Sequence, residues 1–469
     1  MKGIFVVGAG PAGLFAARQI ALAGFDVFLF NRDVKPGGLA EYGIYPLKEK
    51  MKTGLRKQFA KVLDLPNVHY FGNVKIGQGY DLTLKDLEAF HPAAILFACG
   101  AQGTKKLGLP GEDLAGVYAA KDFVYHYNQL PPFASMDFSS GRRIAVVGMG
   151  NVAIDIARWL LLDDPHRRTE EVIIVARRGP LEIKFDKKEV DYISRHLSRE
   201  QLVAELDRVK ERCARVNQDV SPQAVFAQHF RSLEEVHETA IQPRLSFRFL
   251  SSPTAILPDA HGRIGGVEVA ENELVLKPDG STAAKDTGER TTIPVDTLIF
   301  AIGDQHDARI GLPMGREGYA TKPNPDRPNH PSYEVWDPGK QSVLSGRFVA
   351  GWARQASTGL VGIARHDGEV GANKAIEYVK HAPDPGTLSP QEILADIATR
   401  GIHAVTKLDL ALLAKAEQRF AQAGQPSLRA FVENEAMFNA VESERESMQA
   451  EAAARNAEHP SEVPATMRA

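Results

Sequence analysis

The sequence has 469 residues, a length that usually corresponds to two or three domains. Its formal net charge is −3, and 43% of its residues are hydrophobic and 25% charged, which is typical of a globular protein. No run of about 18 apolar residues could cross a membrane, and the N-terminus lacks the layout of a signal peptide, so we expect a cytoplasmic protein without membrane contact. The near-neutral charge gives no indication of nucleic-acid binding.

The sequence contains two cysteines, Cys99 and Cys213, far apart along the chain. They cannot supply a disulfide framework, a cysteine-rich metal or iron–sulfur site, or a Cys-x-x-Cys redox pair. Cys99 lies in an apolar run and is expected to be a small buried side chain rather than a reactive thiol. Any redox chemistry must therefore come from a bound organic cofactor, and no metal site is expected.

The chain is organised around a glycine-rich turn near its start. Residues 4–7 predict a buried strand, residues 8–13 (Gly-Ala-Gly-Pro-Ala-Gly) predict a tight turn, and a helix follows. Gly8 permits the turn, Gly10 leaves room for a pyrophosphate against the backbone, and Gly13 lets helix and strand pack closely. This order of elements predicts a dinucleotide-binding unit.

The next predicted strand, residues 27–30, ends at Asn31, where a dinucleotide-binding fold usually carries an acidic residue for the ribose hydroxyls. An asparagine can accept one hydrogen bond and donate another, so we expect a weaker ribose contact with the site retained. The glycine-rich loop 36–46 then offers backbone that can lie flat against a planar ligand. Further strands are expected at 69–76 and 94–98.

The same layout of strand, turn and helix recurs after a polar connection at about residues 131–141. A strand is predicted at 143–147, a turn at 148–153 (Gly-Met-Gly-Asn-Val-Ala) and a helix at 154–162. The alanine in the last place of the turn is small enough for close packing. Two copies of the motif in one chain are much stronger support than one.

The strand that follows the second motif, residues 172–175, ends near Arg177 and Arg178. An NAD site would carry an acidic residue at this point, whereas two guanidinium groups suit the 2′-phosphate of NADP. An exposed basic turn without a ligand is the alternative. Two nested units imply two dinucleotides, most economically FAD in the outer unit and NADPH in the inner one.

We therefore predict an α/β fold with two nested Rossmann-like dinucleotide-binding domains, a helical excursion and a C-terminal extension. Further strands are expected at 245–249, 266–269, 297–302 and 347–350, and a helix to about Tyr378. The tail is rich in Glu, Ala, Ser and Pro and is expected to be disordered, or a short helix with a loose end. The predicted boundaries are 1–105 and 331–380 for the FAD domain, 106–330 for the NADP domain with a helical insertion near 184–240, 381–441 for a C-terminal segment and 442–469 for the tail.

This layout resembles the two-dinucleotide-binding-domain flavoproteins and, among them, the adrenodoxin reductase-type ferredoxin–NADP reductases. The resemblance covers about residues 2–441 and implies that electrons pass from NADPH through FAD to a ferredoxin-like iron–sulfur protein. It is carried by residues 8–13, 37–39, 72–74, 148–158, 177–181, 351–352 and 358–359, and by the segment 403–441.

The resemblance also implies which residues contact each cofactor. Gly359 would face both cofactors. For the adenosine and pyrophosphate of FAD the implied residues are Gly8, Gly10, Ala12, Gly13, Asn31, Gly38, Leu39 and Ile76, and for its isoalloxazine Trp352, Gly359, Leu360 and Val361. For NADPH they are Gly148, Met149, Gly150, Asn151 and Val152, with Arg177 and Arg178 on the 2′-phosphate and Glu189 nearby.

The sequence departs from the family pattern at three places. Asn31 replaces a glutamate, Ala356-Ser357 stands in place of Gly-Pro, and residues 45–48 lack a histidine of adrenodoxin reductases. The last loop looks more like that of glutamate synthase small subunits, so the electron acceptor stays open between a ferredoxin, a partner enzyme served by an electron-input subunit, and a small oxidant for a diaphorase or monooxygenase. A non-catalytic flavin-binding module would not need Arg177 and Arg178.

Hydride transfer between stacked rings depends on alignment more than on acid–base groups. Lys48 and Asp155 are the candidates for tuning flavin charge or relaying protons, although each could equally be an ordinary residue in the first turn of a helix. A ferredoxin is acidic, so docking should use basic residues. The candidates are Arg177, Arg178, Lys184, Lys187, Lys188, Lys48, Lys50 and Lys52.

Overall fold

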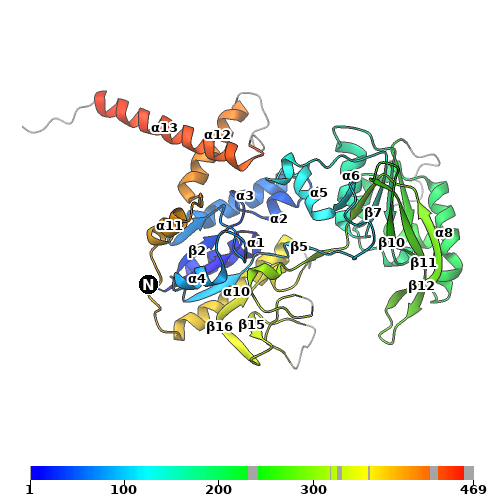
Figure 1. The fold of residues 1–469 in the computed structure, drawn as a ribbon, viewed down its shortest axis with the longest axis horizontal. Coiled ribbons are helices and arrows are strands. Elements are labelled where there is room, and N and C mark those ends of the chain that lie inside the picture. The colour runs from blue at the N-terminus through cyan, green and yellow to red at the C-terminus, as the bar shows by residue number, and fades with distance from the viewer. Residues whose placement is uncertain are drawn as a thin grey trace, which may run out of the picture. The chain divides into compact units, whose positions relative to one another are not determined.

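The computed structural model describes residues 2–230, 241–316, 318–324, 330–356, 360–422 and 431–458. The chain folds into two compact units, whose helices and strands are drawn in Figure 1. The first unit consists of Met1–Gly103, Tyr127–Ser135 and Gln305–Ala469, and the second of Thr104–His126 and Met136–Asp304. The second unit is thus nested within the first along the chain.

The first unit is built on a six-stranded sheet in which neighbouring strands are parallel except β15 and β16. Its strands are apolar runs because both faces of the sheet are covered. Ile4 and Val6 belong to the core on one face, and Phe5 and Val7 to the core on the other. The strand order is β15 (Glu334–Asp337), β16 (Ser342–Val349), β4 (Ala94–Phe97), β1 (Gly3–Val7), β2 (Asp26–Phe30) and β3 (Val68–Phe71).

Helices α1 (Pro11–Leu22) and α10 (Val361–His381) pack against each other on one face of this sheet. Helices α4 (Leu84–Ala89) and α11 (Pro390–Thr399) contribute apolar side chains to the core on the opposite face. The remaining helices of the unit are α2 (Leu39–Tyr42), α3 (Glu49–Leu63), α12 (Lys407–Gln422) and α13 (Asn434–Glu458), with short 3-10 turns at Phe133–Ser135, Ala308–Ile310 and Gly351–Ala353.

The second unit is built on a five-stranded sheet that is parallel throughout. Its order is β6 (Val117–Ala119), β13 (Thr297–Phe300), β7 (Arg143–Val147), β8 (Glu171–Val175) and β9 (Arg244–Arg248). Its helices are α5 (Ala120–Tyr127), α6 (Asn151–Arg158), α7 (Lys187–Asp191), α8 (Arg199–Ala214) and α9 (Pro222–His229). Helix α6 continues into a π-helical turn, Trp159–Asp163, and 3-10 turns lie at Pro180–Glu182 and Ser194–His196. The two-residue strands β5 (Gly103–Thr104) and β14 (Asp304–Gln305) lie where the chain passes between the units.

A three-stranded antiparallel sheet covers one face of this parallel sheet. It is formed by β10 (Ser251–Pro258), β11 (Ile264–Leu276) and β12 (Thr282–Ile293). Val267 and Val269 of β11 share a core with Ala145 and Val147 of β7. The sequence prediction missed β10, β12 and most of β11. Strand β12 is largely polar and exposed and shows no apolar alternation.

Other predicted elements differ in length from those observed. The strand expected at 69–76 ends at Phe71, and β15 was not predicted because a four-residue strand carries little periodicity. The tail from residue 442 was expected to be disordered or to form a short helix with a loose end. Helix α13 continues to Glu458, so residues 442–458 follow the helical alternative. Glu444 is buried in the contact between α12 and α13 and forms ion pairs there with Lys415 at 3.3 Å and Arg419 at 2.8 Å. Residues 459–469 lie outside the described part of the chain.

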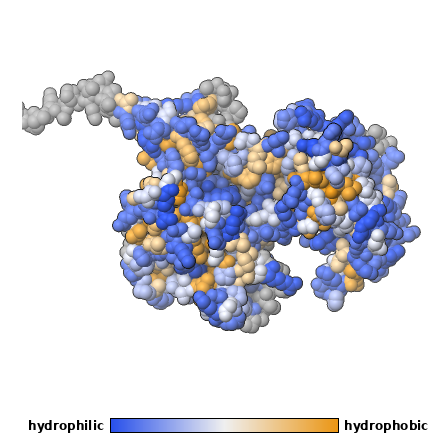
Figure 2. Space-filling view, viewed as in Figure 1, coloured by the Kyte–Doolittle hydropathy of each residue, from blue (hydrophilic) through white to orange (hydrophobic). Residues whose placement is uncertain are grey.

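The observed units also differ from the predicted boundaries at the end of the second unit. The compact units divide at Asp304 and Gln305, whereas the sequence predicted a division at 330. In the described residues, no helix is long and apolar enough to cross a membrane. The face drawn in Figure 2 is mainly hydrophilic, with hydrophobic residues in small groups.

Candidate functional site

The first glycine-rich turn joins β1 to α1 and is shaped by its three glycines. The Gly8 N–H donates to the Phe30 carbonyl oxygen at 2.7 Å, and Gly8 has a φ of 107°, a value that favours glycine. A Cβ on Gly13 would collide with the Gly8 carbonyl oxygen, so close packing of helix and strand requires glycine there. A Cβ on Gly10 would meet no protein atom within 4 Å. Packing therefore explains Gly8 and Gly13, while Gly10 borders open space at the start of α1.

The second glycine-rich turn joins β7 to α6 and has the same geometry. The Gly148 N–H donates to the Val175 carbonyl oxygen at 2.9 Å, and Gly148 has a φ of 139°. A Cβ on Gly148 would collide with the Ala301 carbonyl oxygen, whereas a Cβ on Gly150 would meet no protein atom within 4 Å. Ala153 is fully buried in the place that Gly13 takes in the first turn.

These two turns fit the pyrophosphate groups of two dinucleotides. In each unit, the open space beside the second glycine adjoins the first backbone N–H groups of a helix, which lack partners within the helix. These groups and the positive end of the helix dipole attract phosphate. The open space at Gly10 and at Gly150 leaves room for a phosphate group, and their role in cofactor binding stays a prediction.

Asn31 directs its side chain into the protein. Its Oδ1 accepts a hydrogen bond from the Ala9 N–H at 3.1 Å. Its Nδ2 donates to the carbonyl oxygens of Asp33 and Lys35 at 2.8 and 3.0 Å, and lies 3.1 Å from the Tyr70 hydroxyl oxygen. The amide thus ties the turn to the chain after β2, and only its oxygen has a lone pair left for a ribose hydroxyl.

The loop with the predicted FAD residues Gly38 and Leu39 packs against the first glycine turn. Ala12 and Ile76 are buried, and Leu39 begins α2. The Gly37 N–H donates to the Ala9 carbonyl oxygen at 2.7 Å, and a Cβ on Gly38 would lie 3.1 Å from the Gly10 Cα. The structure therefore brings the predicted loop against the predicted turn.

A cavity of about 250 Å³ lies in the first unit beyond the end of β2. Residues 32–34 and Lys75 line it, next in sequence to the predicted FAD residues Asn31 and Ile76. Met437 and Asn434 of α13 line it as well, so this C-terminal helix contributes to the shape of the cavity.

The turn at Gly351 and Trp352 packs directly on the start of α1. Gly351 has a φ of 63°, and a Cβ on it would lie 2.6 Å from the Ala12 Cβ. Trp352 is half-buried, Leu360 is 79% exposed, and Val361 is the first residue of α10. Gly359, predicted to face both cofactors, lies outside the described residues.

Asp367 holds this turn, although the sequence did not single it out. The carboxylate is buried and accepts hydrogen bonds from the Gly351 N–H, the Arg354 guanidinium and, at 2.9 Å, the Tyr333 hydroxyl. An aspartate within an amphipathic helix usually faces solvent, so the sequence carries no signal for this role.

The two predicted catalytic residues lie in different units. Lys48 occupies the N-cap position of α3 in the first unit, and Asp155 lies in α6 of the second; both are half-buried. Lys52 cannot serve in docking, because its side chain is buried and its Nζ donates to the Glu41 carbonyl oxygen at 2.7 Å and to Asn128 Oδ1 at 2.8 Å. That prediction was wrong because the helical pattern could not show that the first turn of α3 is covered.

The residues predicted for NADPH gather at the carboxyl ends of β7 and β8. Arg177 is exposed and Arg178 half-buried, and within the described residues neither forms an ion pair. The Lys184 N–H donates to the Met149 carbonyl oxygen at 3.0 Å, and the Asp186 N–H donates to Asn151 Oδ1 at 2.7 Å. These bonds join the second turn to the segment that leads into α7, which carries Glu189. Val152 is 48% exposed.

Neither cysteine is suited to thiol chemistry. Burial raises the pKa of Cys99 to about 12 and that of Cys213 to about 11. Both thiols therefore stay protonated at neutral pH, which agrees with the prediction that Cys99 is not a reactive thiol.

Two nested units, each with a turn that fits a pyrophosphate, define a protein of the two-dinucleotide-binding class. A family model described as pyridine nucleotide-disulphide oxidoreductase matches residues 2–225. The NADPH-ferredoxin reductase FprA of Mycobacterium leprae is 31% identical over 416 residues, covering 81% of this chain and 85% of that protein. The mitochondrial NADPH:adrenodoxin oxidoreductase of Bos taurus is 28% identical, covering 87% of this chain and 85% of that protein.

A solved structure of Mycobacterium tuberculosis FprA in complex with NADPH is similar over 94% of this chain and 99% of that chain, with a TM-score of 0.76 and 28% identity. The chain belongs to the family of NADPH-ferredoxin and adrenodoxin reductases. The predicted fold class and the resemblance to this family are confirmed.

Proposed function

We propose that this protein is an NADPH-dependent flavoprotein reductase that passes electrons from NADPH through FAD to a ferredoxin-type one-electron acceptor. Its cofactors are FAD and NADP. The observation that carries the proposal is the repeated glycine turn, with open space at Gly10 and at Gly150 beside a helix N-terminus. In this proposal the first unit holds FAD, and the second unit, which carries Arg177 and Arg178, holds NADPH.

The residues of the chain bind and orient the two cofactors. The backbone N–H groups at the starts of α1 and α6 hold the pyrophosphates, and the Arg177 and Arg178 guanidiniums hold the 2′-phosphate. Asn31 keeps the first turn in shape, and Asp367 fixes the turn that carries Trp352, which would contact the isoalloxazine of FAD. When bound, FAD supplies the conversion of a two-electron hydride donor into two one-electron deliveries. Alignment is therefore the main contribution of the protein.

Lys48 and Asp155 are the residues proposed to act on charge and protons near the flavin. Lys48 lies in the loop that follows α2, and Asp155 lies one turn into the helix that begins at the second glycine turn. Each is half-buried, a setting in which a charge acts over a longer range than in open water.

The proposed partner is an acidic ferredoxin-like iron–sulfur protein, and we place the reaction in the cytoplasm. Exposed Lys184, Lys187 and Lys188 follow Arg177 and Arg178 on the second unit and provide positive charge for docking. Lys50 is exposed on the first unit. A larger partner enzyme or a small oxidant is the alternative acceptor, suggested by the loop at residues 45–48.

The test is anaerobic, NADPH-driven reduction of cytochrome c by the purified FAD-loaded protein, with and without an added ferredoxin and with NADH as control. We expect reduction to depend strongly on ferredoxin and to prefer NADPH. If NADPH bleaches the flavin but ferredoxin does not increase cytochrome c reduction, the proposed NADPH site stands. The electron acceptor would then be a partner enzyme or a small oxidant. Absence of flavin bleaching by NADPH would overturn the proposal.

A further inference from the structure

Strand β11 carries two consecutive buried polar side chains, Glu271 and Asn272, which are 5% and 2% exposed. Alternation along a strand would bury only one of them. The register between β11 and β12 shifts between Ala270 and Asn272, which marks a β-bulge. The sequence carries its trace, because the apolar positions change from odd numbers at Val269 to even numbers at Leu274.

The bulge directs Asn272 to the backbone of the arginine pair. Its Nδ2 donates to the Arg177 carbonyl oxygen at 2.9 Å and to Ser252 Oγ at 2.8 Å. Its own N–H donates to the Leu250 carbonyl oxygen at 2.7 Å. The side chain therefore bridges β11, the start of β10 and the end of β8.

The carbonyl of Arg178, the second residue of the arginine pair, is held by Leu250. The Leu250 N–H donates to the Arg178 carbonyl oxygen at 3.1 Å, and Leu250 has a φ of 47°. A bulky residue in this left-handed region is strained and persists only where its surroundings fix it. The backbone N–H of Asn272 supplies one of these contacts, through the Leu250 carbonyl oxygen. The Asn272 side chain holds the Arg177 carbonyl of the pair.

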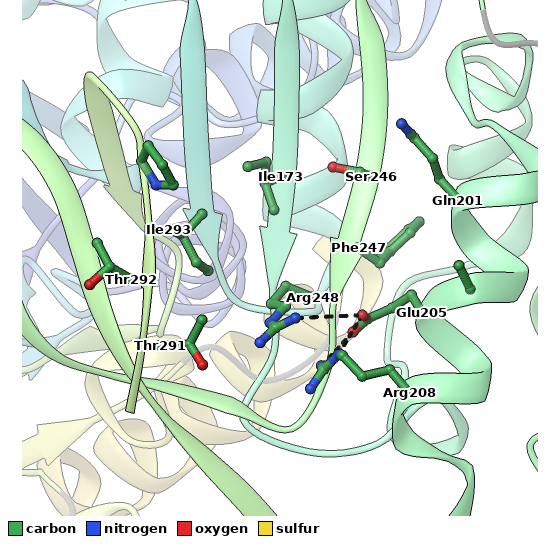
Figure 3. Close-up of a pocket in the computed structure, with 12 residues that line it drawn as sticks. Ile173, Gln201, Glu205, Arg208, Ser246, Phe247, Arg248, Thr291, Thr292 and Ile293 are labelled. Carbon is green, nitrogen blue, oxygen red and sulfur yellow. Dashed lines mark hydrogen bonds and ion pairs between the residues drawn. The ribbon is translucent and has the colours of Figure 1, made fainter. Parts of the chain in front are cut away.

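Glu271 anchors the other side of the bulge. Its carboxylate binds the guanidiniums of Arg208 at 2.7 Å, Arg212 at 2.9 Å and Arg248, in a buried network that is costly to break. Arg208 and Arg248 line a groove of about 440 Å³ between α8, β9 and β12, where Figure 3 shows both pointing toward Glu205. The positive charge in this groove is neutralised by carboxylates, in contrast to that of Arg177 and Arg178.

We propose that Asn272 is a positioning residue for the choice of NADPH over NADH, an inference that rests on the proposed role of Arg177 and Arg178 in 2′-phosphate binding. By holding the Arg177 carbonyl, the Asn272 side chain fixes the turn from which the guanidiniums leave the backbone. The Arg178 carbonyl is held by the Leu250 N–H, a bond that does not depend on the side chain of residue 272. A preorganised pair loses less conformational entropy on gripping a phosphate than a pair on a loose turn. Asn272 touches neither cofactor in this account.

The test uses the FAD-loaded enzyme and measures binding as well as turnover. Titration calorimetry with 2′,5′-ADP and with 5′-AMP compares ligands that differ in the 2′-phosphate. We expect Asn272→Ala to weaken binding of 2′,5′-ADP by ~10-fold, since the Arg177 carbonyl loses the side-chain donor that holds it, and to leave binding of 5′-AMP within about twofold. The KM for NADPH should rise in parallel, with kcat and the KM for NADH nearly unchanged.

Matched variants separate this role from general damage. Ser252→Ala removes the other acceptor of the Asn272 amide and should change neither ligand by more than about twofold. If Asn272→Ala does not retain FAD, Asn272→Asp, which has the same shape without the amide donor, is measured in its place. The inference would be overturned if binding of both ligands weakened equally, or if binding of 2′,5′-ADP did not weaken.

The double variant Arg177→Ser/Arg178→Ser is measured in parallel. If it keeps its preference for 2′,5′-ADP over 5′-AMP, the proposed role of the arginines fails. If it loses that preference while Asn272→Ala keeps it, only the positioning role of Asn272 fails.

Discussion

The two glycine turns have nearly the same backbone geometry. The residues that follow the second strand of each unit, β2 and β8, differ in what their side chains contact. Gly8 and Gly148 both have positive φ, and Gly10 and Gly150 both border open space. After the second strand of each unit, Asn31 turns its amide inward to the backbone, while Arg177 is exposed to solvent.

This difference shows how the chain divides two tasks. The pyrophosphate is common to both dinucleotides, and the backbone of the turn can hold it in either unit. In the proposed function, discrimination between the dinucleotides falls to the residue after the second strand, because folds of this class place the ribose there. In the first unit that residue shapes the protein, and in the second unit it is available to a ligand.

The largest effect on stability is expected at Gly13 of the first glycine turn, where the structure leaves no space for a side chain. Gly13→Ala places a Cβ on the Gly8 carbonyl oxygen, so the backbone must shift, and we expect a loss of ~3 kcal/mol in the free energy of unfolding together with loss of FAD. Urea unfolding and the FAD-to-protein ratio measure both. Gly10→Ala is the matched control: its Cβ meets no protein atom, so the apoprotein should stay as stable as the parent while FAD binds more weakly. Equal stability of the Gly13→Ala and parent apoproteins would contradict the packing role.

The second prediction concerns Arg177, which is exposed, and Arg178, which is half-buried. Arg177→Ser/Arg178→Ser removes two guanidiniums from the 2′-phosphate site, and we expect kcat/KM for NADPH to fall by ~100-fold, with NADH changed by less than about twofold. Stopped-flow reduction of the flavin provides both values. Arg168→Ser, which removes one exposed arginine from the same unit, should leave the preference for NADPH intact. An equal fall in kcat/KM for NADH and NADPH would indicate that Arg177 and Arg178 have a structural role and do not select the cofactor.

The third prediction tests whether Asn31 acts within the protein. Asn31→Ala leaves the buried Ala9 N–H without its partner, and we expect a loss of ~2 kcal/mol in the free energy of unfolding of the apoprotein. Tyr70→Phe removes one polar partner of Asn31 and should cost less. If Asn31→Ala leaves apoprotein stability unchanged and weakens only FAD, the ribose contact predicted from sequence is the better account.

The smallest effect is expected at pH-sensitive Asp86 in the first unit. Hydrogen bonds from Thr83, followed by one from Arg400, hold the pKa of Asp86 at about 2. Because this pKa is lower than in the unfolded chain, the stabilisation is present above about pH 4 and is lost as the pH falls toward 2. We expect Asp86→Asn to lower the free energy of unfolding by ~1 kcal/mol at pH 7, as for loss of a helix cap. In urea unfolding the difference from the parent should shrink between pH 4 and pH 2.5; a difference that stays constant over this range would contradict the assignment.

Most of the fold could be predicted because its signals are local. The parallel strands are short apolar runs, and each glycine turn lies within six consecutive residues. The local sequence therefore identifies both. The antiparallel sheet was largely missed because β12 is polar and exposed and is held by pairing with β11. Helix α13 extends beyond the predicted ordered segment because Glu444 finds Lys415 and Arg419 on α12, partners that a local pattern cannot reveal.

The candidate site divides in the same way. The sequence by itself determined the two turns, the basic pair after β8 and the absence of reactive thiols, since each depends on residue type and near neighbours. Only the tertiary structure decided that Asn31 faces inward, that Lys52 is buried, and that Asp367 and Asn272 hold backbone at the two sites. Asn272 lies 95 residues from Arg177, and no local pattern determines which distant carbonyl a buried amide will reach. That choice is made by packing, because a buried polar group must find its partner wherever the fold places one.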